Sequence, residues 1–206
     1  MKGNRTKMLR NRVAQEAALL LYTSQEKEYK QAKLRASATL GVRVLPSNLE
    51  VAEELDIIAD EREGPQRKNR LLQMRKEAKQ IMEALSEFNP VLVGSVWRGT
   101  ARKSSDIDIS VFSEEYQQIL EHLQNQGYSI KGTERRSVTK AGNKTSSVHI
   151  QVVLDSADIA EIAVRSPQQL GKTERCETYG DIKTGLSLKE LTKVLENNPF
   201  QKFVPH

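Results

Sequence analysis

The chain has 206 residues, a formal net charge of +5, 37% hydrophobic residues and 5% aromatic residues. This length allows one or two compact units, and the composition predicts a mainly aliphatic core. No apolar run approaches the roughly 20 residues that span a bilayer, which argues against a membrane protein. A single cysteine, Cys176, rules out an internal disulfide, and there is no Cys/His cluster for zinc. The basic N-terminus lacks the apolar stretch of a secretion signal, so we expect a reduced, cytoplasmic protein.

The charge is unevenly distributed along the chain. Residues 1–45 contain 10 Lys and Arg against 3 Asp and Glu, a net charge of +7, whereas the remainder has 22 against 24, a net charge of −2. A basic segment of this kind favours contact with RNA or another polyanion. The alternative is a basic helix that packs on the acidic segment 50–63. Aromatic residues that could stack on bases are not interleaved with the basic ones, so RNA binding is a hypothesis.

The first 88 residues have the periodicity of helices. A long helix is expected over about residues 5–40, ended by Gly41. Ser47 and Glu50 form a capping box that begins the next helix, and Gly64-Pro65 separates that helix from a third over about 66–87. The third helix carries an apolar stripe expected to be buried against a core: Leu71, Met74, Ala78, Ile81, Leu85 and Phe88. Asn89-Pro90 ends it.

The second half alternates between strand-like and helix-like segments. Strands are expected at 91–93, 107–112, 128–139, 148–154 and 159–164. Helices are expected at 114–126, ended by Gly127, and at 187–196, capped by Ser187. Residues 141–143 and 155–158 have turn chemistry. We therefore expect an α/β (α+β) protein, with a helical N-terminal region over residues 1–88 and a core with a small mixed sheet over residues 89–206. The sequence does not decide whether the helical region is a separate lobe.

Asp106 and Asp108 are the leading candidates for a metal site. Because side chains alternate along a strand, residues two apart point to the same face, while Ile107 and Ile109 point into a core. Two adjacent carboxylates repel each other unless a cation lies between them. Mg²⁺ prefers carboxylate oxygen and is often shared with substrate phosphates, so Mg²⁺ is the expected cofactor, with Mn²⁺ as the other candidate.

Gly94 and Ser95 follow the strand 91–93 at a sharp turn. Glycine lets the backbone approach a ligand closely, and a helix that begins after Ser95 would present free N–H groups to a phosphate. Gly99 and Thr100 are expected to shape the loop between the two strands. The basic residues of this loop, Arg98, Arg102 and Lys103, either offset triphosphate charge or are solvated.

Taken together, residues 94–108 read Gly-Ser-x-x-x-Gly-Thr-x-x-x-x-Ser-Asp-x-Asp. This stretch resembles the signature of the DNA polymerase β-like nucleotidyltransferase superfamily, most closely its minimal nucleotidyltransferase branch. The close match covers about sixteen residues, and the order of strands and helices extends it loosely from about residue 89 to 166. The resemblance implies that Asp106 and Asp108 bind metal and that Gly94 and Ser95 hold the triphosphate. It places Gly99, Thr100 and Ser105 in the nucleotide-binding loop, and the charge of Arg98 makes it a further candidate for binding the nucleotide.

The resemblance also implies a third acidic residue on a neighbouring strand, where it would join the metal ligands and help to activate the attacking hydroxyl. Glu161, flanked by apolar residues in the strand 159–164, fits that description, although Asp is more usual at this position. Asp155 and Asp158 are alternatives, but they have the character of turn residues. Gln151 cannot replace a metal-binding carboxylate, and we expect His149 to be a strand residue that faces a neighbour.

The sequence thus predicts an enzyme that transfers a nucleoside monophosphate from an NTP, with ATP favoured, to an acceptor hydroxyl. An RNA 3′ end is the favoured acceptor, a protein side chain is next, and a small molecule is also conceivable. One alternative is a module that binds nucleotide or RNA without turnover. Another is a pyrophosphokinase similar to (p)ppGpp synthetases, against which the Gly-Ser to Ser-Asp-x-Asp motif argues. No Walker P-loop or dinucleotide fingerprint is present.

Overall fold

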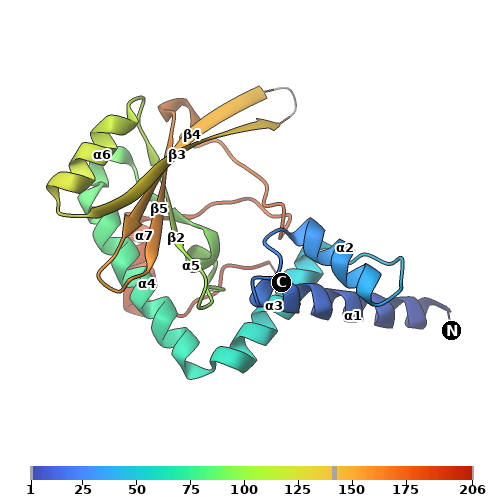
Figure 1. Cartoon of the computed structure of the whole chain (residues 1–206). Coiled ribbons are helices and arrows are strands. Elements are labelled where there is room, and N and C mark those ends of the chain that lie inside the picture. Colours follow the sequence, from blue (N-terminus) through green and yellow to red (C-terminus); the bar gives the residue numbers. More distant parts are fainter. Residues whose placement is uncertain (1, 141–142, 206) are drawn as a thin grey trace. The chain divides into compact units, whose positions relative to one another are not determined.

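The chain folds into two compact units in a computed structural model that describes residues 2–140 and 143–205 (Figure 1). The first unit contains the chain up to Arg67 and the segment Arg175–Ile182, and the second contains Lys68–Glu174 and Lys183–Val204. The boundary falls inside helix α4 (Pro65–Ala84) instead of near residue 88. The physical reason is that the buried stripe of α4 belongs to the core of the second unit.

The first unit is built from three helices: α1 (Lys2–Tyr22), α2 (Tyr29–Thr39) and α3 (Asn48–Glu63). Small side chains dominate where α1 packs on α2 and α3, which lets the helix backbones approach closely. The buried set includes Val13, Ala14, Ala17, Ala18, Ala32, Ala36, Val51, Leu55 and Ala59. Val13, Ala17 and Leu20, which recur at helical spacing, are buried on this face.

The prediction of one helix over residues 5–40 was wrong. The chain leaves the helix after Tyr22, Ser24 adopts φ 56°, and a new helix begins at Tyr29. The N–H groups of Gln25 and Glu26 both donate to the Leu20 carbonyl, which satisfies part of the open end of α1. Neither Gly nor Pro marks this break. It is favoured by packing, because the reversal lets the alanines of α2 pack back on α1.

The predicted ends of the later helices in this unit are confirmed. Gly41 lies beyond the end of α2 with φ 64°. The Ser47 side chain accepts from the Glu50 N–H, and the Glu50 carboxylate accepts from the Ser47 N–H, which completes the capping box. Gly64 caps the end of α3 with φ 56°.

The second unit contains a six-stranded mixed sheet, which confirms the expected fold class. Its strands are β1 (Val91–Val93), β2 (Ile107–Phe112), β3 (Ser129–Lys140), β4 (Asn143–Val153), β5 (Ile159–Arg165) and β6 (Leu186–Ser187). Its helices after α4 are α5 (Gly94–Arg98), α6 (Tyr116–Asn125) and α7 (Leu188–Asn197), and short 3₁₀ turns span Ser86–Phe88 and Pro167–Gln169. Among the described residues, no helix is long and apolar enough to cross a membrane.

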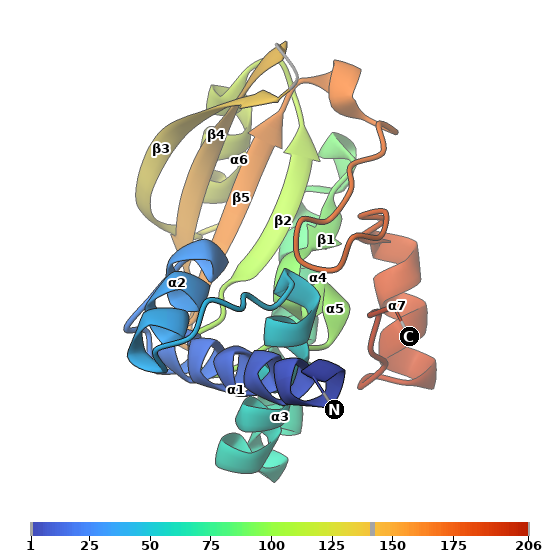
Figure 2. The same ribbon diagram turned by 90° about the vertical axis from the view of Figure 1, so that its right-hand side faces the viewer.

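The strands lie in the order β3-β4-β5-β2-β1-β6, and Figure 2 shows the first five of them. In the described chain β2 and β5 run parallel, and the other four pairs are antiparallel. Alternate residues therefore divide the sheet into two faces. One face is apolar and fully buried, and α4 and α6 lie on that side of the sheet. The buried side chains of this face are Leu92, Ile107, Ile109, Val111, Ile150, Val152, Ala160 and Ile162.

The predicted elements of this unit differ from the observed ones mainly at their ends. Helix α4 ends at Ala84, where the carbonyl lies 2.7 Å from His122 Nε2 of α6. Strand β4 begins at Asn143, not at Val148, because its polar first residues pair with β3. Of the predicted turn 141–143, residues 141 and 142 lie outside the described residues. Ser187 caps α7 with Glu190, as predicted.

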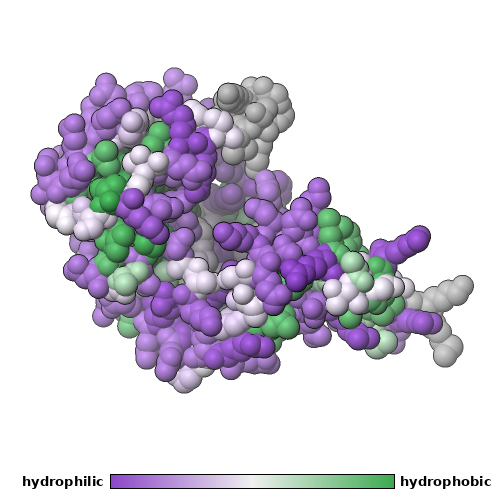
Figure 3. Space-filling model, viewed as in Figure 1, coloured by the Kyte–Doolittle hydropathy of each residue, from purple (hydrophilic) through white to green (hydrophobic). Residues whose placement is uncertain are grey.

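A buried arginine of α4 connects helix α5 to the segment that follows α7. The Arg75 side chain of α4 is fully buried. It donates to four backbone carbonyls, those of Val96, Trp97, Pro199 and Gln201, at 2.7–3.2 Å. These bonds link α4, α5 and the segment after α7. In the view of Figure 3, hydrophilic side chains cover most of the surface, and hydrophobic ones form separate patches.

Candidate functional site

The register of the sheet brings three polar side chains into one row on its open face. Asp108 of β2 is the direct partner of Glu161 of β5, and Glu161 is the direct partner of Gln151 of β4. Directly paired residues point to the same side of a sheet. Because the next residues along each strand, Ile107, Ile109, Ala160 and Ile162, are fully buried, the row lies opposite the apolar core. The sequence could not give this pairing, which depends on the register of β2 against β5.

The carboxylates of this row influence one another. Burial, followed by the charges of Glu161 and Asp106, raises the pKa of Asp108 to about 7. Burial and then the charge of Glu161 also raise the pKa of Asp106, which lies one residue before β2, while Lys131 opposes the shift. Burial and the neighbouring carboxylates thus both disfavour the ionised forms, and a nearby cation would offset this penalty.

Gly94 is required by the position of the Asp108 carboxylate. A Cβ atom added at Gly94 would lie 2.1 Å from Asp108 Oδ2 and 2.9 Å from its Cγ, and the residue has φ 71°. Residue 94 is also the first residue of α5, so the first N–H groups of this short helix have no partner within it. Because Gly94 has no Cβ atom, the Asp108 carboxylate can lie against the backbone of the turn.

Glu161 is held by a side chain from the adjacent strand β4 and by one from β3, the strand beyond it. Its Oε1 atom lies 2.6 Å from His149 Nδ1 and 2.9 Å from an Arg136 guanidinium nitrogen. At 2.6 Å the proton must lie between histidine and carboxylate, so Nδ1–H donates, and Nε2 faces the Ser147 hydroxyl at 2.9 Å. The result is a chain of polar contacts from Ser147 through His149 to Glu161. His149 thus faces a neighbour, as the sequence indicated.

The alternative acids lie in the β4–β5 turn, as expected. Asp158 Oδ1 pairs with the Arg70 guanidinium at 2.5 Å, which ties the turn to α4. The charge of Asp158 nevertheless contributes to the raised pKa of Asp106. Asp155 is exposed. Of the three acids considered in the sequence, Glu161 is the one that pairs directly with Asp108.

The donor set fits a hard divalent cation in its chemistry, since Asp106 and Asp108 offer carboxylate oxygen atoms. Glu161 is committed to Arg136 and His149 in this arrangement. Within residues 2–140 and 143–205, no three His, Cys, Asp or Glu side chains already form a group that could hold a metal ion. A cation shared by all three acids would therefore require the Glu161 side chain to move.

Some residues of the loop between β1 and β2 lie beside the row of Asp108 and Glu161, here called the acidic row, and others face elsewhere. Ser95 is half-buried beside Gly94. Arg98 does not reach the row: its side chain is 3% exposed, stacks over Trp97 and donates to the Phe203 carbonyl. A Cβ at Gly99 would lie 2.7 Å from the Gln201 carbonyl oxygen, so this glycine accommodates the C-terminal segment.

Two further loop residues have local roles. The Thr100 N–H donates to the Ser95 carbonyl and closes the turn after α5. The Ser105 hydroxyl accepts from the Arg102 N–H at 3.0 Å, which closes the turn before Asp106. These contacts shape the loop, as expected for Thr100, and the nucleotide-binding roles of Thr100 and Ser105 stay predictions.

Sequence reasoning missed Arg136 and Lys131 of β3. Both lie in a polar strand that reads as solvated, and Arg136 reaches Glu161 across β4 only because of the β3–β4 register. The period-two pattern of Glu134 and Arg136 was the available signal, but it carries no information on which strand lies next to β3.

Comparisons with known proteins give partial matches. Residues 75–169 match a family model described as a domain of unknown function, DUF4269. A search of curated proteins finds no match. Among solved structures, the RNA terminal uridylyl transferase Cid1 has 18% sequence identity and a TM-score of 0.34, over 47% of this chain and 30% of that one.

Two other solved structures are similar to the same extent. A cytoplasmic RNA terminal U-transferase has 18% identity and a TM-score of 0.33, over 57% of this chain and 35% of that one. The non-canonical poly(A) polymerase complex GLD-2–GLD-3 has 14% identity and a TM-score of 0.34, over 57% and 40%. The chain thus spans about a third of the length of these structures.

Proposed function

We propose that this protein is a nucleotidyltransferase that depends on Mg²⁺ or Mn²⁺. It moves a nucleoside monophosphate from an NTP, with ATP favoured, to an acceptor hydroxyl and releases pyrophosphate. The observation that carries the proposal is the row of Asp108 and Glu161, joined electrostatically by Asp106, beside the glycine turn at residue 94. The resemblance of residues 94–108 to the polymerase β-like signature gives this geometry its interpretation.

Each residue has a defined part in the proposed reaction. The free N–H groups after Gly94 and the Ser95 hydroxyl position the β- and γ-phosphates. Asp106 and Asp108 hold the divalent cation, which when bound would act as a Lewis acid on the phosphate oxygens. The acceptor oxygen bonds to the α-phosphorus while the bond from that phosphorus to pyrophosphate breaks. Glu161 takes the acceptor's proton, and His149 and Arg136 orient its carboxylate.

The favoured acceptor is an RNA end, with a protein side chain as the next candidate. The support for RNA is the net charge of +7 in residues 1–45. Three of the basic residues in this segment, Arg5, Lys7 and Arg12, are exposed on α1. Arg98 has no part in the proposed nucleotide site, because its buried side chain is committed to Phe203.

The test is transfer of label from α-³²P-labelled ATP, CTP, GTP and UTP with Mg²⁺ into total RNA and total cell protein. Label should enter one acceptor class with wild-type protein and be lost with the Asp106→Asn/Asp108→Asn variant. Asp155→Asn is the matched control, because it removes an exposed turn carboxylate from the same unit and should leave transfer unchanged.

A second candidate function is a nucleotide-binding module without turnover. The contacts of Glu161 with Arg136 and His149 favour it, since they occupy the acid that the reaction needs. This function predicts metal-dependent binding of a fluorescent ATP analogue, abolished by Asp108→Asn, with no transfer to any acceptor. A rate of label transfer by the wild type above that of the Asp106→Asn/Asp108→Asn variant would exclude this second function.

A further inference from the structure

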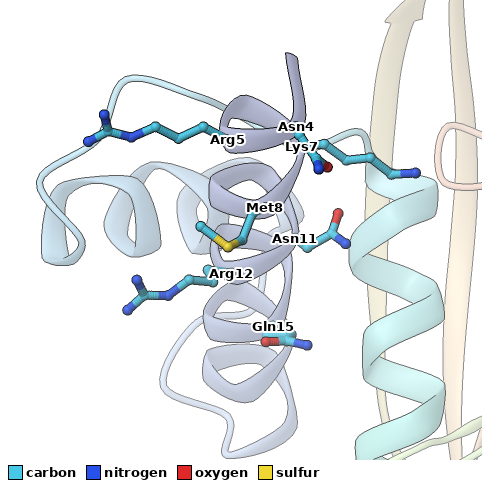
Figure 4. A pocket seen from close by; sticks show the side chains of 7 residues that line it. All are labelled: Asn4, Arg5, Lys7, Met8, Asn11, Arg12 and Gln15. Carbon is cyan, nitrogen blue, oxygen red and sulfur yellow. The ribbon is translucent and has the colours of Figure 1, made fainter. Parts of the chain in front are cut away.

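Helix α1 carries a groove lined by cationic and amide side chains (Figure 4). The groove has a volume of about 660 Å³ and lies along residues 4–15. Its cations are Arg5, Lys7 and Arg12, and its amides are Asn4, Asn11 and Gln15, with Met8 among them. We refer to this surface as the α1 groove.

The helical repeat arranges these residues in a regular order. Arg5 and Arg12 are seven residues apart, so they lie on one edge of the groove about 10 Å apart along the axis. Lys7 lies on the other edge, and the amides lie between the two edges. Figure 4 shows Arg5 and Arg12 extending to one side of α1, with Lys7, Asn11 and Gln15 toward the other.

Among the described residues, the cations of the α1 groove are not held in ion pairs. Residues 4–15 contain no Asp or Glu. Arg10, which points away from the groove, pairs with Glu50 of α3 at 2.8 Å. By contrast, none of the ion pairs among the described residues involves Arg5, Lys7 or Arg12, and all three are exposed. Arg10 is thus paired, whereas Arg5, Lys7 and Arg12 are exposed and form none of these ion pairs. Arg12 also lines a neighbouring hollow with Glu16, Glu54 and Glu61, which lowers the net charge at that end of the groove.

We infer that the α1 groove binds single-stranded RNA. The cations at the two edges would contact phosphates, and the amides would hydrogen-bond to ribose 2′-hydroxyls and base edges, since an amide both donates and accepts. This inference deepens the RNA acceptor named in the proposed function by assigning a binding surface for it, and binding can be measured whether or not transfer occurs. A membrane surface is a poorer fit, because Met8 is the one apolar side chain of the groove and membrane-bound helices need a continuous apolar face.

The test is fluorescence anisotropy of a fluorescein-labelled 20-nucleotide single-stranded RNA of mixed sequence with the full chain at 50–200 mM salt. The variant Arg5→Gln/Lys7→Gln/Arg12→Gln should weaken binding at least tenfold at the lowest salt concentration. Its slope of log affinity against log salt should be smaller by about 2, since each phosphate contact on a single strand contributes about 0.7.

The matched control is Lys27→Gln/Lys30→Gln/Arg43→Gln, which removes the same charge from exposed positions of the same unit. It should change affinity less than threefold. All six positions are exposed, so both variants should keep the wild-type helical circular dichroism. Equal losses in the two variants, or no RNA binding by the wild type, would overturn the inference. Equal or tighter binding to phosphatidylserine vesicles or to polyglutamate would do the same.

The outcome is separable from that of the transfer assay. RNA binding through the α1 groove without any label transfer would contradict the proposed function alone. Transfer to protein or RNA by the Arg5→Gln/Lys7→Gln/Arg12→Gln variant at the wild-type rate, with RNA affinity unchanged, would contradict the groove alone.

Discussion

Replacing Asp108 by Asn should stabilise the metal-free protein at neutral and alkaline pH. Asp108 is held next to Glu161 and Asp106, and burial with these two charges raises its pKa to about 7 from 3.8. The folded state therefore binds a proton at Asp108 that the unfolded state has already released. Asn keeps the shape of the side chain and carries no charge at any pH.

The sign and size of the effect follow from linkage. A carboxyl with a raised folded-state pKa contributes stability that is fully present below about pH 4 and lost as the pH rises to about 7. The two pKa values differ by about 3 pH units, and each unit corresponds to about 1.4 kcal/mol. The advantage of Asp108→Asn over wild type should thus grow by up to about 4 kcal/mol between pH 4 and pH 8.

The measurement is urea unfolding of both proteins in EDTA at pH 4, 5, 6, 7 and 8, with the free energy of unfolding compared at each pH. Because every other titrating group is common to the two proteins, the growth of the difference with pH isolates the acidic row. A difference that stays constant from pH 4 to pH 8 would refute the electrostatic reasoning. So would a difference that shrinks as the pH rises.

Other perturbations test separate parts of the structure. Gly94→Ala should destabilise the protein by about 2–4 kcal/mol in urea unfolding, because the new Cβ overlaps Asp108, whereas Gly41→Ala, with similar φ and no neighbour within 4 Å, should cost about 1 kcal/mol. His149→Ala should lower kcat of nucleotidyl transfer about 10–100-fold with KM for the NTP nearly unchanged; a change in KM alone would contradict a role in orienting Glu161. Arg75→Met should cost at least about 3 kcal/mol, since four carbonyls lose their donor, and an unchanged midpoint of thermal unfolding would contradict this. Mg²⁺ at pH 8 should raise the thermal midpoint of wild type but not of Asp108→Asn, and EDTA should reverse the rise; equal rises in both proteins would place the cation elsewhere.

Local patterns were sufficient to predict most of the elements. The capping boxes at Ser47 and Ser187, the stripe of α4 and the strand β2 all follow from residues close together in the sequence. The break after Tyr22 escaped prediction because it depends on α2 packing on α1, with no Gly or Pro to mark it.

The candidate site divides in the same way. Asp106, Asp108 and Gly94 belong to one contiguous motif, so their proximity could be anticipated. The pairing of Glu161 with Asp108 and the contact of Arg136 with Glu161 depend on strand registers that sequence periodicity does not contain. For Arg98 the local pattern was misleading. The basic loop indicated a side chain that faces phosphate or solvent, but the side chain is buried and stacks on Trp97.

The four bonds of Arg75 end on backbone carbonyl oxygens and on no side chain. Any amino acid at positions 96, 97, 199 and 201 offers the same carbonyl, so this joint places no demand of its own on their identity. Relatives could therefore vary at these four positions while keeping the arginine, and a search for covarying pairs would miss the connection. The interaction would be visible in an alignment only as one invariant basic residue inside an otherwise apolar helix stripe.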